Sequence, residues 1–246
     1  MIHSGSLLTK KGNTYIAEYE GGRIFRLDKN KKLVQFSGNG KEGFAGDGKG
    51  VSQGVFNGMH NLAWSSEEVL YISDTHNHLV RKIDLKANLI STFAGTPNKK
   101  GFSGDGGPAT KAKLNTPISI SLTPDEKTML ISDISNLRIR AVDLKSGIIR
   151  TVAGNGKRGK PIDEMPAIAQ PLIGPRAAIM DNSGNLFILE RNGNALRVVR
   201  PNGKIQTLAG TGKTGDQDGP ALKSTFNGPK HLCFDKNGNI IMPMTR

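Results

Sequence analysis

Cysteine is almost absent from this chain of 246 residues, since Cys233 is the only one. A single thiol excludes an internal disulfide and any zinc cluster built on cysteines. Cys233 stands in the apolar run Leu232-Cys233-Phe234, where we expect a small buried side chain rather than a thiol nucleophile. Aromatic residues make up only 5% of the chain. Few rings are therefore available to stack on bases, which disfavours a binder of single-stranded nucleic acid.

Long apolar runs and acidic residues are also scarce. No run approaches the roughly 18 apolar residues that a membrane helix needs, so we expect a soluble chain without a membrane span. The N-terminal MIHSGSLLTKKG lacks a charged start followed by an apolar stretch, and no signal peptide is expected there. Lys and Arg number 34 against 21 Asp and Glu, a formal charge of +13. This balance favours a polyanionic partner, although it can equally serve general solubility.

The chain does contain abundant glycine (31 residues) and an internal repeat. An aliphatic or aromatic residue followed by Ala-Gly or Ser-Gly recurs every 56–59 residues, at Phe36, Phe93, Val152 and Leu208. An acid that ends an apolar run recurs at the same intervals, at Glu18, Asp74, Asp133 and Glu190. Two independent landmarks with one period indicate structural repeats.

Each repeat predicts four short strands, most clearly at Asn61–Trp64, Val69–Ser73, Leu79–Ile83 and Leu89–Phe93. A fifth copy supplies only the first two strands. We call the turn between second and third strands, which begins at the recurring acid, the acidic turn. The segment of roughly twenty residues between one repeat and the next is the linking loop, and loops of this length are often functional. Four-stranded sheets at a fixed period bury both faces by stacking radially, as in a β-propeller.

The expected fold is therefore all-β, a β-propeller of four-stranded antiparallel blades. We assign residues 1–246 to a single domain with about 4.5 blades. The predicted blades are residues 1–40, 57–96, 117–156 and 175–212, with a partial blade at 229–246.

ISDTHNHLVRKID and ISDISNLRIRAVD resemble the signature of NHL repeats, and FSGDGGPATKAKLNTP resembles the linking loop of bacterial and teneurin-type relatives. The resemblance covers essentially the whole chain. It is weaker in the first and fourth copies, where Glu18-Tyr19-Glu20-Gly21-Gly22 and Glu190-Arg191-Asn192-Gly193-Asn194 replace Asp-x-x-Asn-His. NHL propellers usually have six blades, which implies that this chain is an incomplete ring. Many relatives with the Gly-Asp-Gly-Gly-Pro-Ala-Thr loop are secreted, so an extracytoplasmic location is favoured over others.

The resemblance also implies that linking loops and acidic turns share one face, around the mouth of a central channel. There we expect a non-catalytic site for a protein, a glycan or another acidic partner. Asp74 and Asp133 recur in register with Arg81 and Arg140, which indicates a structural ion pair or turn cap. The candidate ligand-binding residues are Glu18, His60, Asn61, His76, His78, Arg176, Glu190, Arg191, Lys230 and His231.

Three alternatives remain open at this stage. The first is a metal-dependent propeller hydrolase, lactonase or lyase, for which Glu18, Asn61, Glu190 and His231 are the nearest available channel residues. The second is an RNA-binding domain, as in tripartite-motif relatives, and the third is a scaffold whose neighbouring domain carries the activity. No catalytic residue, metal ligand or cofactor is assigned, and Asp216-x-Asp218-Gly219 lacks the remaining ligands of a calcium loop.

Overall fold

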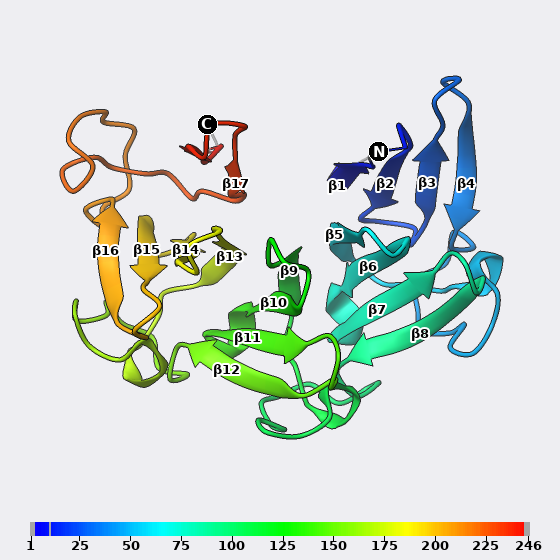
Figure 1. Ribbon diagram of the computed structural model, residues 1–246, viewed down its shortest axis with the longest axis horizontal. Coiled ribbons are helices and arrows are strands. Elements are labelled where there is room, and N and C mark those ends of the chain that lie inside the picture. Colours follow the sequence, from blue (N-terminus) through cyan, green and yellow to red (C-terminus); the bar gives the residue numbers. More distant parts are fainter. Residues whose placement is uncertain (1–2, 10, 244–246) are drawn as a thin grey trace. The chain divides into compact units, whose positions relative to one another are not determined.

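The computed structural model describes residues 3–9 and 11–243, and its regular structure is almost entirely β. Four antiparallel sheets have four strands each, and a fifth has two (Figure 1). We number them as blades 1 to 5. Blade 1 contains β1 (His3–Leu8), β2 (Thr14–Glu18), β3 (Ile24–Leu27) and β4 (Leu33–Ser37). Blade 2 contains β5 (Met59–Ser65), β6 (Val69–Asp74), β7 (Leu79–Asp84) and β8 (Leu89–Ala94).

The remaining blades repeat this meander. Blade 3 contains β9 (Pro117–Leu122), β10 (Thr128–Asp133), β11 (Arg138–Asp143) and β12 (Ile149–Ala153). Blade 4 contains β13 (Pro175–Met180), β14 (Leu186–Glu190), β15 (Ala195–Val199) and β16 (Ile205–Ala209). Blade 5 contains β17 (Cys233–Phe234) and β18 (Ile240–Ile241). The prediction of an all-β fold with four-stranded antiparallel sheets is confirmed, and the four strands predicted for blade 2 agree with β5 to β8 to within two residues.

Helical structure is confined to single 3₁₀ turns in the described part of the chain. Three lie in linking loops: η1 (Val51–Gln53), η3 (Ala109–Lys111) and η5 (Ala167–Ala169). Two lie in acidic turns: η2 (Thr75–Asn77) and η4 (Ile134–Asn136). Among the residues described, no helix has the length and apolar character needed to cross a membrane.

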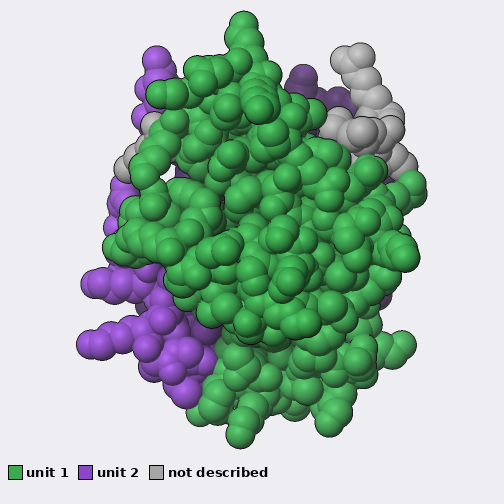
Figure 2. Space-filling model, turned by 90° about the vertical axis from the view of Figure 1, so that its right-hand side faces the viewer, with its two compact units in different colours: residues 1–120 green, residues 121–246 purple. Residues whose placement is uncertain are grey.

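The chain divides into two compact units, residues 1–120 and 121–246 (Figure 2). Blades 1 and 2 with their linking loops form unit 1, and the chain passes into unit 2 near the end of β9. Unit 2 holds the rest of blade 3 together with blades 4 and 5. The assignment of all 246 residues to a single domain stays a prediction.

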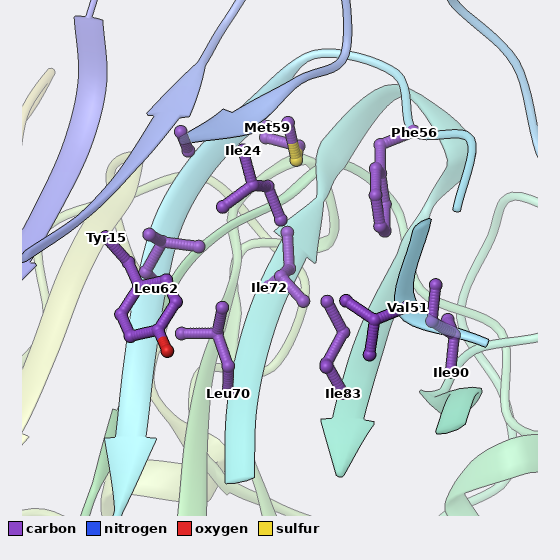
Figure 3. Close-up of a cluster of buried hydrophobic side chains, with 11 residues drawn as sticks. Tyr15, Ile24, Val51, Phe56, Met59, Leu62, Leu70, Ile72, Ile83 and Ile90 are labelled. Atoms are coloured by element: carbon purple, nitrogen blue, oxygen red, sulfur yellow. The ribbon is translucent and has the colours of Figure 1, made fainter. Parts of the chain in front are cut away.

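Unit 1 is held together by apolar side chains that fill the space between two sheets (Figure 3). Blade 1 contributes Tyr15 and Ile24, and blade 2 contributes Leu62, Leu70 and Ile72 among others. These side chains are at most 6% exposed, and each fully buried aliphatic group stabilises the fold by roughly 1.5–3 kcal/mol. The two sheets therefore pack face to face, as the stacking argument predicted.

Two cores of the same kind lie among the described residues of unit 2. Leu130, Ile139 and Ala141 of blade 3 pack against Ala178 and Ile188 of blade 4, among others. The opposite face of blade 4 packs on blade 5. Burial on both faces explains why β14 and β15 are buried along their whole length instead of alternating.

The recurring Ala/Ser-Gly landmark marks a place where only glycine fits. Gly38, Gly95, Gly154 and Gly210 all have positive φ, between 87° and 93°. A side chain at Gly154 would meet the carbonyl oxygen of Leu137 across the acidic turn. The residue before the landmark lies in a register shift between the third and fourth strands, as between Ile139 and Arg140 of β11. The repeat landmark is thus a β-bulge followed by a left-handed glycine.

The prediction that Cys233 is buried was wrong, because its side chain is exposed. Side chains alternate between the two faces of a strand. Leu232 is buried, and Phe234 packs edge-on against Phe187 of blade 4, with 5.6 Å between ring centroids. Cys233 points to the opposite face of β17 from Phe234, away from the apolar contact.

Candidate functional site

The acidic turns of blades 2, 3 and 4 each open on a carboxylate that holds a buried arginine. Arg81 is completely buried and reaches Asp74 (3.3 Å) and Asp47 of the preceding linking loop (2.6 Å). Its guanidinium also lies 4.6 Å from the ring centroid of Phe44. The predicted pairing of Asp74 with Arg81, and of Asp133 with Arg140 (3.5 Å), is confirmed. Because a buried ion must be paired to be tolerated, these residues organise the blade and its linking loop.

Glu190 occupies the same position in blade 4 and has the same role. Its Oε2 lies 2.8 Å from both Nε and an Nη of Arg197, and its Oε1 accepts the Ile173 N–H at 2.5 Å. Glu18 of blade 1 binds Arg23 at 2.6 and 2.8 Å. Arg23 lies two positions earlier than the arginines of the other blades, and its side chain is 36% exposed. Both glutamates that seemed to depart from the repeat are therefore engaged by an arginine of their own blade.

The Asn and His of the signature motif shape the acidic turn of blade 2. The amide of Asn77 donates to both Asp74 carboxylate oxygens at 2.9 Å and to the carbonyl of Gly43 at 2.7 Å. Burial raises the pKa of Asp74 to about 6, against the opposing effect of these hydrogen bonds and of Arg81. His78 ends the turn in the left-handed conformation, with φ 59°. Its Nδ1 accepts the backbone N–H of Thr116 at 3.1 Å.

His78 is consequently held as the neutral imidazole. Burial lowers its pKa, and the charges of Lys100 and His76 lower it further. A ring nitrogen that accepts a backbone N–H has no proton to give, so protonation would break the contact between the acidic turn and the linking loop. The position is left-handed in the other blades as well, where Gly22, Leu137 and Asn194 stand.

Two candidate residues lie where the first strand of the blade bulges. The register of β5 against β6 shifts between Met59 and Leu62, which places His60 and Asn61 in the irregular stretch. Asn61 serves the backbone there: its Oδ1 accepts the N–H of Ile120 at 3.1 Å. Bulges re-aim side chains, and they are over-represented beside active sites.

His60 is half-buried and belongs to a cluster of three rings in unit 1. The ring centroid of Tyr19 lies 4.7 Å from that of His60 and 5.6 Å from that of His76. The Tyr19 hydroxyl and Nε2 of His76 are 3.2 Å apart, and Nδ1 of His76 lies 3.3 Å from Oδ1 of Asn57. Sequence reasoning missed Tyr19, although it replaces the signature residue next to the acid in blade 1. We call Tyr19, His60 and His76 the ring cluster.

Unit 2 brings together a second set of candidates, which consists of basic residues. The register of β13 against β14 shifts between Pro175 and Ala177, so Arg176 stands in a bulge as His60 does. Arg176 is 9% exposed. Partial burial lowers the pKa of His231, and the positive charges of Arg176 and Lys230 lower it further. We call Arg176, Lys230 and His231 the basic cluster, whereas Arg191 stands exposed in the acidic turn of blade 4.

Candidate metal ligands do not converge within the described ranges 3–9 and 11–243. No group of three or more His, Cys, Asp and Glu side chains is arranged there to hold a metal ion. Of the four residues named for a channel metal, Glu18 and Glu190 have arginine partners and Asn61 serves the backbone. In both units, potential ligand-binding groups lie where the first strand of a blade begins with a bulge. These groups are the rings around His60 in unit 1 and the basic residues around Arg176 in unit 2.

Comparison with known proteins gives relatives over nearly the whole chain, although no family model matches. "Protein SUPPRESSOR OF QUENCHING 1, chloroplastic" of Arabidopsis thaliana is 27% identical over 96% of this chain and 23% of its own length. "NHL repeat-containing protein 2" of Bos taurus is 25% identical over 92% of this chain and 42% of its own. Teneurin-1 of Gallus gallus is 37% identical over 33% of this chain. The chain thus spans less than half the length of these relatives.

Solved structures agree on the fold. An auxiliary nutrient binding protein from Bacteroides ovatus superposes with a TM-score of 0.70 at 16% identity, over 98% of this chain and 56% of that one. A gluconolactonase from Xanthomonas campestris superposes with a TM-score of 0.63 at 13% identity, over 98% and 69%. Identities this low bear on the fold alone. The sequence relatives and the structural neighbours together support an NHL-repeat β-propeller.

Proposed function

We propose that this propeller is a non-catalytic binding module whose acidic partner contacts the linking loops, the acidic turns and the bulged starts of the first strands. The observation that carries the proposal is the basic cluster. It places Arg176 in a bulge, close enough to His231 for its charge to lower the pKa of that ring. Basic residues gathered in one place raise the local positive potential, which attracts an anionic ligand.

The linking loops add positive charge at the same end of each blade. They open with lysines and arginines that are all exposed: Lys41, Lys99, Lys100, Lys157, Arg158, Lys160 and Lys213. The ring cluster of unit 1 supplies imidazole and phenol groups, which suit hydrogen bonding to hydroxyls and stacking on apolar faces. Carboxylate, sulfate or uronate groups on a protein or glycan would be the natural complement. The bacterial and teneurin-type character of the loop at 102–117 belongs to this proposal as well.

A second candidate function is a metal-dependent hydrolase or lyase, since a gluconolactonase and a virginiamycin B lyase are among the structural neighbours. Such chemistry needs carboxylates free to bind a metal ion or move a proton. Glu18 and Glu190 are instead held by Arg23 and Arg197. We therefore rank binding first.

Binding of a heparin oligosaccharide, a poly-glutamate peptide and an oligo-uridine RNA at several salt concentrations tests the proposal. We expect binding that weakens steeply with salt, because exposed charges are screened within a Debye length of about 10 Å at 0.1 M. Arg176→Ala with Lys230→Ala should weaken binding by about threefold to tenfold, from two ion pairs of roughly 0.5 kcal/mol or somewhat more each.

The matched control removes two exposed lysines from the opposite ends of the strands. Lys127→Ala with Lys236→Ala changes the net charge equally, but these lysines lie in the hairpins between first and second strands. Equal loss in both double variants would mean that only net charge matters and would refute a site at the linking-loop end. A marked preference for RNA over the other two probes would favour the RNA-binding alternative.

A further inference from the structure

The interface between blades 1 and 2 is sealed by aromatic rings near the hairpins between first and second strands. Tyr15 lies in a cross-strand row with Arg26 and Val34. Phe36 packs edge-on against Tyr15 at 5.0 Å between ring centroids, and Trp64 of blade 2 stacks on it at 5.6 Å. The guanidinium of Arg26 lies over Phe36 at 5.9 Å. These contacts place three rings against one another between the two sheets.

The interface between blades 4 and 5 is sealed in the same way. Phe187 holds the row position of Tyr15 and is followed across the sheet by Val198 and Gln206. Phe234 of β17 closes over Phe187 at 5.6 Å between centroids. Leu208 packs on the same cluster. Aromatic side chains thus close the equivalent place at the interface between blades 1 and 2 and at that between blades 4 and 5.

Between blades 3 and 4 the same row contains no ring. Its residues are Leu130, Ala141 and Arg150, with Val152 in the place of Phe36 and Met180 in the place of Trp64. A cleft of about 320 Å³ opens there, within the range of small-molecule sites. The cleft lies wholly within unit 2 and is lined by residues of both blades.

Arg150 is the one charged side chain of this lining with nothing to bind. It is exposed at the edge of the cleft, and its guanidinium has no hydrogen-bond or ion-pair partner among the residues described. Asp181 accepts the backbone N–H groups of Ser183 and Asn185, at 2.9 and 2.8 Å. Asp125 accepts the Thr123 hydroxyl at 2.6 Å. These two carboxylates stabilise their own hairpins, so Arg150 is left to recognise a ligand.

We propose that the cleft between blades 3 and 4 binds a small aromatic carboxylate, whose ring replaces the missing aromatic side chain and whose carboxylate pairs with Arg150. The apolar walls formed by Leu130, Val152 and Met180 suit a flat ring, as the corresponding walls in blades 1 and 4 already hold one. A guanidinium binds a carboxylate through two parallel N–H donors, which gives the site its selectivity for an anion. This site is separate from the binding face proposed above.

Indole-3-acetate is the test probe, with neutral indole and cationic tryptamine as charge controls. In protein labelled with ¹³C at the methionine methyl groups, the ring of a bound probe shifts the Met180 resonance, which Met180→Leu assigns. We expect indole-3-acetate to shift and saturate this signal at lower concentration than indole, and tryptamine to shift it least. An absence of any shift with indole-3-acetate, up to roughly 10 mM, would overturn the proposal.

Arg150→Val tests the charge of the site and Leu130→Tyr tests the space available to the ring of the ligand. Arg150→Val, which installs the residue of blade 1, should weaken indole-3-acetate about tenfold or more while leaving indole unchanged. The control variant Arg158→Val removes another exposed arginine of unit 2 and should leave the binding of both indole-3-acetate and indole unchanged. Leu130→Tyr, which installs the blade 1 ring, should abolish binding of both probes, with circular dichroism confirming the fold. If Arg150→Val binds indole-3-acetate as tightly as the unmodified chain, or Leu130→Tyr still binds it, the proposal is wrong.

Discussion

Glu190→Gln is the change that best distinguishes a structural carboxylate from a ligand-binding one. Glu190 is completely buried, and the side chain of its partner Arg197 is only 2% exposed. Gln keeps an acceptor for the Ile173 N–H but leaves the Arg197 charge without its counterion. Removing one partner of a buried ion pair costs about 3–5 kcal/mol. We expect a loss of that size in the free energy of unfolding.

Denaturant unfolding followed by intrinsic fluorescence and circular dichroism measures this loss. The matched control is Glu18→Gln, at the same repeat position, where Arg23 reaches solvent and the loss should be much smaller. Adding Arg197→Met to Glu190→Gln removes the stranded charge and should recover most of the stability. The reasoning is refuted if Glu190→Gln lies within about 1 kcal/mol of the unmodified chain, or if the second change recovers nothing.

Three further predictions concern the acidic turns. Leu137 is a branched apolar residue at φ 53°, so Leu137→Asn should raise the free energy of unfolding by about 0.5–1 kcal/mol; a lower melting temperature would contradict this. Gly154→Ala places a side chain against the Leu137 carbonyl oxygen and should lower the free energy of unfolding by well over about 1 kcal/mol. The control is Gly147→Ala, whose side chain meets nothing within 4 Å and which should cost roughly 1 kcal/mol. Equal losses in free energy of unfolding would show that the bulge at Gly154 can relax. His78 has a lowered pKa in the folded state, so its contribution to stability is complete above the unfolded value of 6.5 and is lost as the pH falls through the folded value. His78→Asn should therefore flatten the loss of stability between about pH 7.5 and 5, measured by thermal melting, and an unchanged slope would assign the acid sensitivity elsewhere.

The strands could be read from the sequence because their determinants are local. Apolar runs, period-two alternation and turn residues recur in every repeat, so each unit corrects the interpretation of the others. The recurring landmark of the Phe-Ala-Gly type marks the end of the fourth strand, and its physical basis is a bulge followed by a left-handed glycine. The pairing of Asp74 with Arg81 could be predicted because the acid and the arginine recur in register. Glu190 and Arg197 have the same spacing, which indicates the same pairing in blade 4.

The candidate site depended on contacts between segments far apart in the chain. Tyr19 and His60 meet across two blades, and no spacing predicts which turn approaches which strand. The bulges that place His60 and Arg176 depend on the register of neighbouring strands. The partner of Glu18 could not be placed from the sequence, because Arg23 lies two positions earlier than the arginines of the other blades.

The sequence alone determined the repeat, the strands and the all-β class, since these depend on residues close together in the chain. Only the tertiary structure decided which side chains remain free, because burial and pairing are set by the neighbouring sheet. Cys233 is exposed for this reason, because only Leu232 and Phe234 of the same run face blade 4. The cleft beside Arg150 lies where Leu130 and Met180 stand at positions that hold rings in blades 1, 2, 4 and 5, and that these two residues border one cleft is visible only once the sheets are packed.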